Sequence, residues 1–250
     1  MAEGPLVYYY ALKLNRAFAG KKVNIIAGFG EKRVAVVKID HIEAVGKQIR
    51  IFLSSNQVIL IHLMMWGSWR FYRKGVKWDK DASKARFIIE TDEIQAVAFS
   101  APVVRFFRRE ELISDPKWGN SGPDPLKENF SREEFFYRLM SDRKREIGEA
   151  LLDQKVIAGI GNILRIEVLF RSKIHPKREV GTLNQKDLNE LVRWILVLST
   201  QWMKSIMKGK RTTWHMVYRK KGKPCPRCGH PIEFFRQAGR ITYACPVCQK

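Results

Sequence analysis

The spacing of apolar residues changes along the chain and separates a helical start, a β-rich part and a helical remainder. Apolar positions at helical spacing run from Val7 to Phe18 and stop before Gly20, which predicts a helix that ends at a glycine. After this glycine the apolar residues, mostly Val, Ile and Phe, occur in short runs between polar turns. These runs are 33–39, 49–53, 58–63, 86–90 and 94–99. They predict an N-terminal β-sandwich flanked by the helix.

A polar stretch over residues 110–129 follows the last of these runs. It contains one Asp-Pro and one Gly-Pro-Asp-Pro sequence, which are typical of turns and connections, and we interpret it as a linker. The expected organisation is an N-terminal domain over 1–109, a linker over 110–130, a helical domain over 131–220 and a C-terminal finger over 221–250.

The helical remainder begins at Ser131, because Ser131 and Glu134 have the spacing of a reciprocal capping box. A second helix is marked around Ile147, and a third over 163–171 is expected to begin at Asn162 as its N-cap. A long last helix has one apolar stripe, formed by Leu188, Leu191, Val192, Ile195, Trp202, Met203 and Ile206. Together with the sandwich, these helices predict an α+β protein of more than one domain.

All four cysteines lie among the last 26 residues, as Cys225-x-x-Cys228 and Cys245-x-x-Cys248 with 16 residues between the pairs. This is the spacing of a zinc ribbon, in which each pair supplies two thiolates to one tetrahedral ion. The residues between the pairs predict a β-hairpin. Disulfides or free thiols are the alternative interpretation. Since four thiolates leave no open coordination position, we expect one structural Zn²⁺ ion and no metal catalysis.

The chain has 46 Lys and Arg against 25 Asp and Glu, which gives a net charge of +21. This excess favours a polyanionic partner, with nucleic acid as the first candidate and a membrane surface as the alternative. The longest apolar stretches are too short to cross a bilayer, so no membrane segment is expected. The N-terminus also lacks the pattern of a secretory signal. We therefore expect an intracellular protein, in the cytoplasm and nucleoid or in a nucleus.

Three separated stretches together resemble the formamidopyrimidine-DNA glycosylase and endonuclease VIII family. Residues 158–170, Ala-Gly-Ile-Gly-Asn-Ile-Leu-Arg-Ile-Glu-Val-Leu-Phe, are similar to its helix-two-turn-helix signature, and 218–228 with 239–250 are similar to its C-terminal finger. Glu3-Gly4-Pro5 resembles its N-terminal catalytic sequence. The resemblance implies a monomeric DNA glycosylase of base-excision repair, with or without AP lyase activity, that acts on damaged double-stranded DNA.

The resemblance also implies roles for single residues. Glu3 matches the catalytic acid that protonates the sugar or the leaving base, and Lys47 matches a lysine of the catalytic domain that binds a backbone phosphate. Asn162 and Arg240 match residues that bind phosphates beside the lesion. Singly, each has an ordinary structural explanation as a solvated acid, a surface charge or a helix cap. Together with the finger and the signature, they indicate contacts with DNA.

An enzyme that acts on a stacked base must extrude it and fill the gap with apolar side chains. The stretch from His62 to Trp66 stands at the position of the family's wedge, and Met64, Met65 and Trp66 are the candidates. We group His62 with these expected DNA contacts. Packing of the same side chains in the core is the alternative.

Two departures from the family pattern favour the endonuclease VIII branch over the 8-oxoguanine branch. Residues 100–105, Ser-Ala-Pro-Val-Val-Arg, replace the Asp-Pro-Arg-Arg-Phe-Gly pattern of a second wedge loop. The segment 209–218 is too short for the loop that covers an 8-oxoguanine base in that branch. We therefore expect oxidised pyrimidines or ring-opened purines as substrates.

Position 2 departs from the family in a way that bears on catalysis. The family's nucleophile is the secondary amine of a proline there, whereas this chain has Ala2. If Met1 is removed, the free Ala2 amine can still attack near neutral pH. Its Schiff base can lose a proton, unlike a proline iminium, so we expect weaker strand cleavage. A catalytically silent protein that binds lesions or abasic sites is therefore the alternative to a DNA glycosylase.

Overall fold

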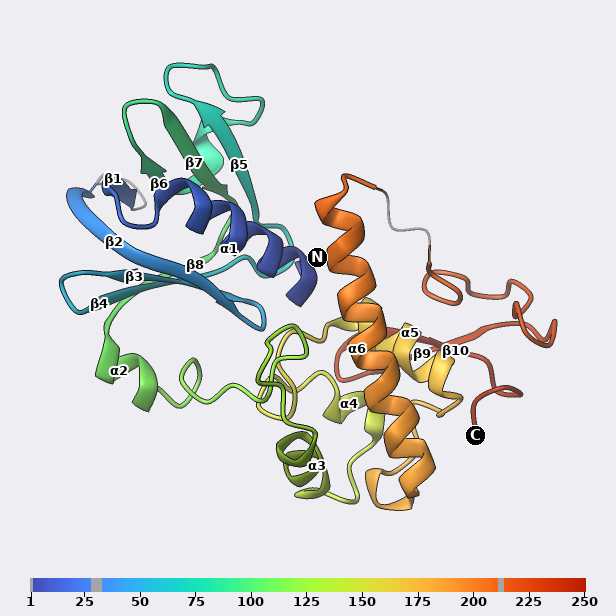
Figure 1. Ribbon diagram of the computed structural model, residues 1–250. Helices are drawn as coiled ribbons and strands as arrows, with labels where there is room; N and C mark the ends of the chain where they lie inside the picture. Colours follow the sequence, from blue (N-terminus) through green and yellow to red (C-terminus); the bar gives the residue numbers. More distant parts are fainter. Residues whose placement is uncertain (1, 28–32, 211–213) are drawn as a thin grey trace. The chain divides into compact units, whose positions relative to one another are not determined.

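The computed structural model describes residues 2–27, 33–210 and 214–250 (Figure 1). Within these ranges the chain forms two compact units. The first contains Ala2 and residues 6–120, and the second contains residues 3–5 together with 121–250. The start of the chain is therefore divided, because Glu3 to Pro5 group with the C-terminal part.

The described residues of the first unit form an eight-stranded antiparallel sheet in the order β5-β7-β6-β1-β2-β3-β4-β8. The strands are β1 Lys22–Ala27, β2 Arg33–Val45, β3 Gln48–Leu53, β4 Gln57–His62, β5 Ser68–Arg73, β6 Ala85–Glu90, β7 Ile94–Phe99 and β8 Val103–Arg108. The first half of β2 pairs with β1 and its second half with β3. The register shifts between Ile39 and His41, and this irregularity allows one long strand to belong to both layers of the sandwich.

The main core of this unit lies between the two layers. Alternate strand residues are buried there, among them Ile89 from β6 and Ile51 from β3. Helix α1 (Gly4–Phe18) contributes Val7, Leu14 and Phe18, which are fully buried in the same cluster. The predicted sandwich and its flanking helix are confirmed. Gly20 follows the helix end at φ 76°, a conformation that glycine adopts without strain.

Three strands and one helix were not predicted. Strands β5 and β8 are the two edges of the sheet, and arginines such as Arg70 and Arg105 interrupt the apolar pattern there. Strand β1 was the third strand that was not predicted, and the run predicted over 33–39 is only the first half of β2. Helix α2 (Arg109–Ser114) stands at the start of the expected linker, and the two units divide after Asn120.

The second unit is helical apart from one hairpin. Its elements are α3 Arg132–Met140, α4 Ile147–Ala150, α5 Asn162–Ser172, α6 Gln185–Met207, β9 Glu233–Gln237 and β10 Arg240–Ala244. Ser131 caps α3 as predicted, since its Oγ accepts the N–H of Glu134 at 3.0 Å. The Glu134 carboxylate binds the Arg138 side chain and makes no hydrogen bond to the Ser131 N–H, so Ser131 caps the helix without the second bond of a reciprocal capping box. No helix among the described residues is long and apolar enough to span a membrane.

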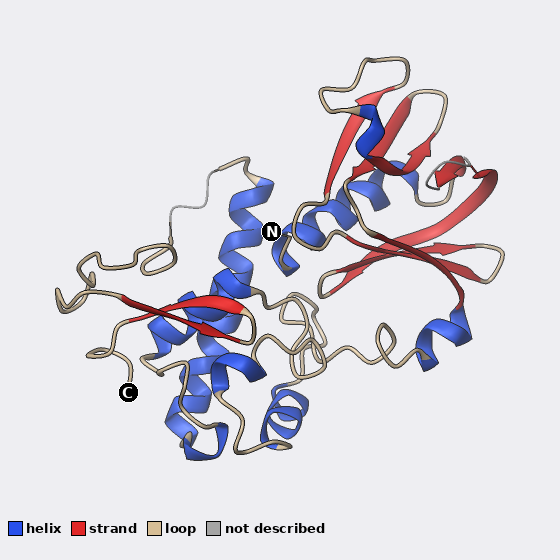
Figure 2. Ribbon diagram, turned by 180° about the vertical axis from the view of Figure 1, so that it is seen from behind, coloured by secondary structure: helices blue, strands red, loops and turns tan. Residues whose placement is uncertain are grey.

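Strands β9 and β10 form a tight hairpin that packs against α5 (Figure 2). Two residues connect them, Ala238 at φ 47° and Gly239 at φ 70°. Positive φ at both positions is the geometry that suits two-residue hairpins, because its twist matches that of the strands. The turn delivers Arg240 directly to the first position of β10.

Candidate functional site

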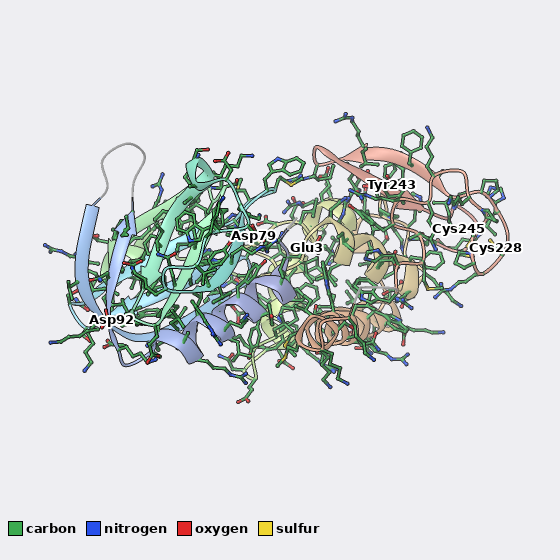
Figure 3. All side chains as sticks on the ribbon, turned by 90° about the horizontal axis from the view of Figure 1, so that it is seen from above. Glu3, Asp79, Asp92, Cys228, Tyr243 and Cys245 are labelled. Atoms are coloured by element: carbon green, nitrogen blue, oxygen red, sulfur yellow. The ribbon has the colours of Figure 1, made fainter. Side chains whose placement is uncertain are left out.

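The Glu3 side chain lies fully buried at the N-terminal end of α5 (Figure 3). One carboxylate oxygen, Oε1, accepts the N–H of Ile163 at 2.8 Å, and the other, Oε2, accepts the N–H of Leu164 at 3.1 Å. The first N–H groups of a helix have no partner within the helix, and the helix dipole favours a negative charge beside them. The anion bound at this helix start is therefore the protein's own Glu3.

Gly4 and Gly161 make room for this arrangement. A Cβ atom on Gly161 would lie 2.4 Å from the Glu3 Cδ, and one on Gly4 would lie 2.9 Å from the Gly159 Cα. The Gly4 N–H also donates to the Gly159 carbonyl at 2.9 Å. The start of the chain can approach α5 this closely only because these positions have no side chain.

The prediction that Asn162 caps α5 is wrong. The N-cap is Gly161, and Asn162 is the first residue of the helix. Glu3 supplies the capping oxygens that a side chain at the N-cap normally supplies. Asn162 is instead almost buried beside the hairpin, where its Nδ2 donates to the Ile241 carbonyl at 2.9 Å.

Two charged residues of α5 that were not singled out from the sequence are fully buried. Glu167 accepts the backbone N–H groups of Met216, Val217 and Tyr218, all within 2.9 Å, and so fixes the segment that leads to the finger. Arg165 binds both strands of the hairpin. The sequence does contain a signal for these two residues, because they lie inside the apolar run Ile-Leu-Arg-Ile-Glu-Val-Leu-Phe. A charged side chain in such a run is expected to be buried and to need hydrogen-bond partners.

The four cysteines gather at one place, and Cys228 and Cys245 are labelled in Figure 3. All four Sγ atoms lie within 4.8 Å of one another, with 3.9 Å between Cys225 and Cys248 and 3.5 Å between Cys228 and Cys245. Four sulfurs at 2.3 Å from a tetrahedral zinc ion stand about 3.8 Å apart, so the cluster fits zinc, whereas disulfides are far shorter. The residues hold one structural zinc ion, as predicted.

The finger has little apolar core of its own. Cys225 and Cys245 pack in a small cluster with Ile166 and Phe170, which belong to α5. Arg227, between the first two cysteines, donates to the Phe170 carbonyl at 2.8 Å. Zinc and α5 together therefore hold the finger in place.

We expect purified protein to retain about one zinc per chain after dialysis, because a small thiolate site of this kind couples metal binding to folding. Cys245→Ser should lose the metal and loosen residues 219–250. Val247→Ser changes an exposed residue between Cys245 and Cys248 and is the matched control. Elemental analysis and hydrogen exchange measure both effects, and a wild-type zinc content below about half an equivalent would contradict the assignment.

Lys47 and His62 are close in the first unit. Lys47 is half-buried in the turn between β2 and β3, directly after Gly46 at φ 57°. Burial, and then the charges of Lys47 and Lys117, lower the pKa of His62 to about 4. His62 is therefore neutral near pH 7, and its Nδ1 can accept the N–H of Met64 at 3.1 Å.

The candidate wedge is an exposed turn between β4 and β5. Met64 is 46% exposed and Trp66 is 84% exposed, whereas Met65 is half-buried. The Gly67 N–H closes the turn on the Leu63 carbonyl at 2.9 Å, where a Cβ on Gly67 would collide at 2.5 Å. Met64 and Trp66 do not pack in the core, so that alternative is excluded for these two side chains.

Ala2 is 6% exposed and joins the apolar core of the first unit. Met1 lies outside the described residues.

Three family models match successive parts of this chain. Residues 1–106 match the formamidopyrimidine-DNA glycosylase N-terminal domain, 121–213 match its H2TH domain, and 222–250 match the zinc finger found in FPG and IleRS. A formamidopyrimidine-DNA glycosylase of Protochlamydia amoebophila (strain UWE25) is 32% identical over 282 residues, and the match covers the whole of both chains. The chain belongs to the formamidopyrimidine-DNA glycosylase family. An endonuclease 8 of Enterobacter sp. (strain 638) is 30% identical over 264 residues, again over both whole chains.

Solved structures of the same family share the fold. A formamidopyrimidine-DNA glycosylase of Lactococcus lactis, non-covalently bound to DNA with an AP site, is 26% identical with a TM-score of 0.85 over the whole of both chains. The expected sandwich, helix-two-turn-helix domain and finger are thus confirmed. Relatives of both names match at similar identity, and the branch within the family stays a prediction.

Proposed function

We propose that this family member is a DNA glycosylase that removes oxidised bases from double-stranded DNA, using the amine of residue 2 and the carboxyl group of Glu3. The buried position of Glu3, fixed by two backbone N–H groups, is the observation on which the proposal depends. A solvated surface acid needs no such site. Consecutive Cα atoms are about 3.8 Å apart, so the amine of residue 2 and Glu3 belong to one reaction centre.

The amine of residue 2 and the carboxyl group of Glu3 suit the two parts of base release, which are nucleophilic attack and proton transfer. The amine nitrogen forms a bond to C1′ of the damaged nucleotide, and the bond between C1′ and the base breaks with its electron pair leaving on the base. The Glu3 carboxylate takes up the proton that the amine loses as it bonds to C1′, and it passes this proton to the sugar oxygen or the leaving base. The bond between C1′ and the ring oxygen of the sugar then breaks, which gives a Schiff base, and hydrolysis of this Schiff base by water returns the free amine.

Charge and the exposed wedge support binding of DNA. The net charge of +21 favours a partner with many phosphates, and we assign single phosphates to Lys47, Asn162 and Arg240. Trp66 and Met64 have the exposure that a wedge between base pairs needs, with Met65 beside them. His62 supports this turn through its bond to the Met64 N–H, and a neutral ring keeps that lone pair available.

Oxidised pyrimidines and ring-opened purines are the proposed substrates, as in the endonuclease VIII branch. Residues 103–108 form the edge strand β8 at the place of the second wedge loop, which supports this choice. The short segment 209–218 also supports it, although residues 211–213 lie outside the described ranges. The Lactococcus lactis enzyme, 25% identical, has itself been solved with DNA that contains an oxidised pyrimidine.

We expect single-turnover base release from an oxidised pyrimidine to be at least about tenfold faster than from an 8-oxoguanine:cytosine pair. An abasic duplex should also be bound in preference to 8-oxoguanine:cytosine. The measurement uses one duplex sequence that differs only at the lesion. Equal or faster release of 8-oxoguanine would contradict the substrate proposal.

A catalytically silent protein that binds lesions is the second candidate, and Ala2 at the position of the family's proline is the observation that favours it. The same lesion panel separates the two functions. Tight binding of abasic DNA without release of any base, by protein with a verified free Ala2 amine, would support the silent protein.

A further inference from the structure

Arg165 is a fully buried cation that binds four neutral acceptors. Its Nη1 donates to the Gly148 carbonyl at 3.1 Å and to Gln237 Oε1 at 2.8 Å. Its Nη2 donates to Asn162 Oδ1 at 2.7 Å and to Thr242 Oγ1 at 2.6 Å. The Nε atom has no hydrogen-bond partner among the described residues. Burial of a charge without a directly bound carboxylate is costly, so this arrangement calls for an explanation.

Arg145 of the same unit has a simpler environment. Arg145 binds the Asp153 carboxylate at 2.9 Å, as expected for an ion pair that stabilises a fold. Burial is the main cause that lowers the pKa of Arg165, to about 10, and the opposite charges of Glu3 and Glu149 act against it. Arg165 therefore remains protonated near pH 7, with its charge close to Glu3.

The partners of Arg165 connect the start of α5 to the finger hairpin. The Asn162 amide is held at both ends, because its Oδ1 accepts from Arg165 and its Nδ2 donates to the Ile241 carbonyl. Gln237 is the last residue of β9, directly before the two-residue turn, and Thr242 lies on β10 two residues after Arg240. One planar guanidinium thus contacts the first residue of α5 and both strands of the hairpin, which a lysine ammonium cannot reproduce.

We propose that Arg165 is a positioning residue, which holds Asn162 and the hairpin with Arg240 at a fixed spacing for two phosphates of bound DNA. This inference rests on the proposed function, because Asn162 and Arg240 are phosphate contacts only if the protein binds DNA as a glycosylase does. Arg165 itself is 0% exposed and contacts no DNA. Its effect on binding must pass through the residues that it orients.

The test is the salt dependence of affinity for a duplex with a tetrahydrofuran abasic analogue. Each phosphate contact of a cation contributes about 0.9 to the log–log slope. Arg240→Ala should therefore flatten the slope by about 0.9, and Arg165→Met should flatten it by a similar amount with an affinity loss on the order of tenfold. The double variant should lose no more slope than either single variant. Arg145→Met is the control and should leave the slope unchanged.

Additive slopes in the double variant, or an unchanged slope in Arg165→Met, would overturn the inference. A wild-type slope and affinity in Arg165→Lys would also overturn the inference, since a positive charge without the planar guanidinium would then be enough. If Arg165→Met loses zinc or unfolds, Thr242→Val removes one contact with little change of shape and should shift the slope in the same direction. The same slopes can be measured on an undamaged duplex, where no base is released. A failure of the positioning role can therefore be distinguished from a failure of the proposed glycosylase function.

Discussion

Glu3→Gln is expected to abolish base release, with a loss of at least about 10²-fold to 10⁴-fold in single-turnover rate, and to leave DNA affinity nearly unchanged. Glutamine keeps the shape of the side chain but cannot supply the proton. Its Oε1 can still accept one of the N–H groups of Ile163 and Leu164, whereas its amide would face the other. The folded protein should therefore lose about 1–3 kcal/mol of unfolding free energy, because one buried N–H group is left without an acceptor.

The measurement pairs single-turnover base release with affinity for abasic DNA and with the melting temperature. Glu133→Gln is the matched control, because Glu133 is an exposed glutamate in the first turn of α3. It should change neither rate nor affinity. If Glu3→Gln released bases at the wild-type rate, the proton donor would have to be another group, and Glu3 would be only a helix cap.

Ala2→Pro is expected to increase strand cleavage more than base release, with little effect on binding. A proline iminium keeps its positive charge, whereas the Schiff base of Ala2 can become a neutral imine, which is a poorer electron sink. In protein with a free Ala2 amine, borohydride should trap a covalent adduct between the N-terminal residue and damaged DNA. Intact-mass analysis of the protein and gel analysis of the nicked and trapped DNA measure these effects.

Protein that retains Met1 is the control for the nucleophile, because its Ala2 has only an amide nitrogen. The adduct should be absent in that preparation. Should protein with a verified free amine give neither adduct nor base release on a broad lesion panel, and Ala2→Pro restore nothing, the glycosylase proposal would be wrong.

Much of the fold followed from local pattern. The flanking helix, the zinc hairpin and the inner strands of the sheet other than β1 have strong apolar periodicity or fixed cysteine spacing, and these features depend on neighbouring residues only. The edge strands β5 and β8 were missed because one side of an edge strand faces solvent and tolerates Arg70 or Arg105. Their place in the sheet depends on partners distant in the sequence.

The site was predicted less completely than the fold. Resemblance proposed Glu3, Asn162 and Arg240 as site residues, but the sequence placed Asn162 at the wrong position of the helix. The buried charges Arg165 and Glu167 were missed, because a charged residue inside an apolar helix does not reveal its partners. These partners lie on the hairpin and on the segment before it.

Residue type and short-range spacing were enough to predict the zinc ligands, the domain types and the excess of positive charge. Tertiary packing sets the position of Glu3, since its carboxylate caps a helix whose N–H group at Ile163 is 160 residues away. It also decided that Gly161 is needed for the space it leaves and that Arg165 joins the helix to the hairpin. Contacts between distant segments depend on the packing of whole elements, and no local pattern records them.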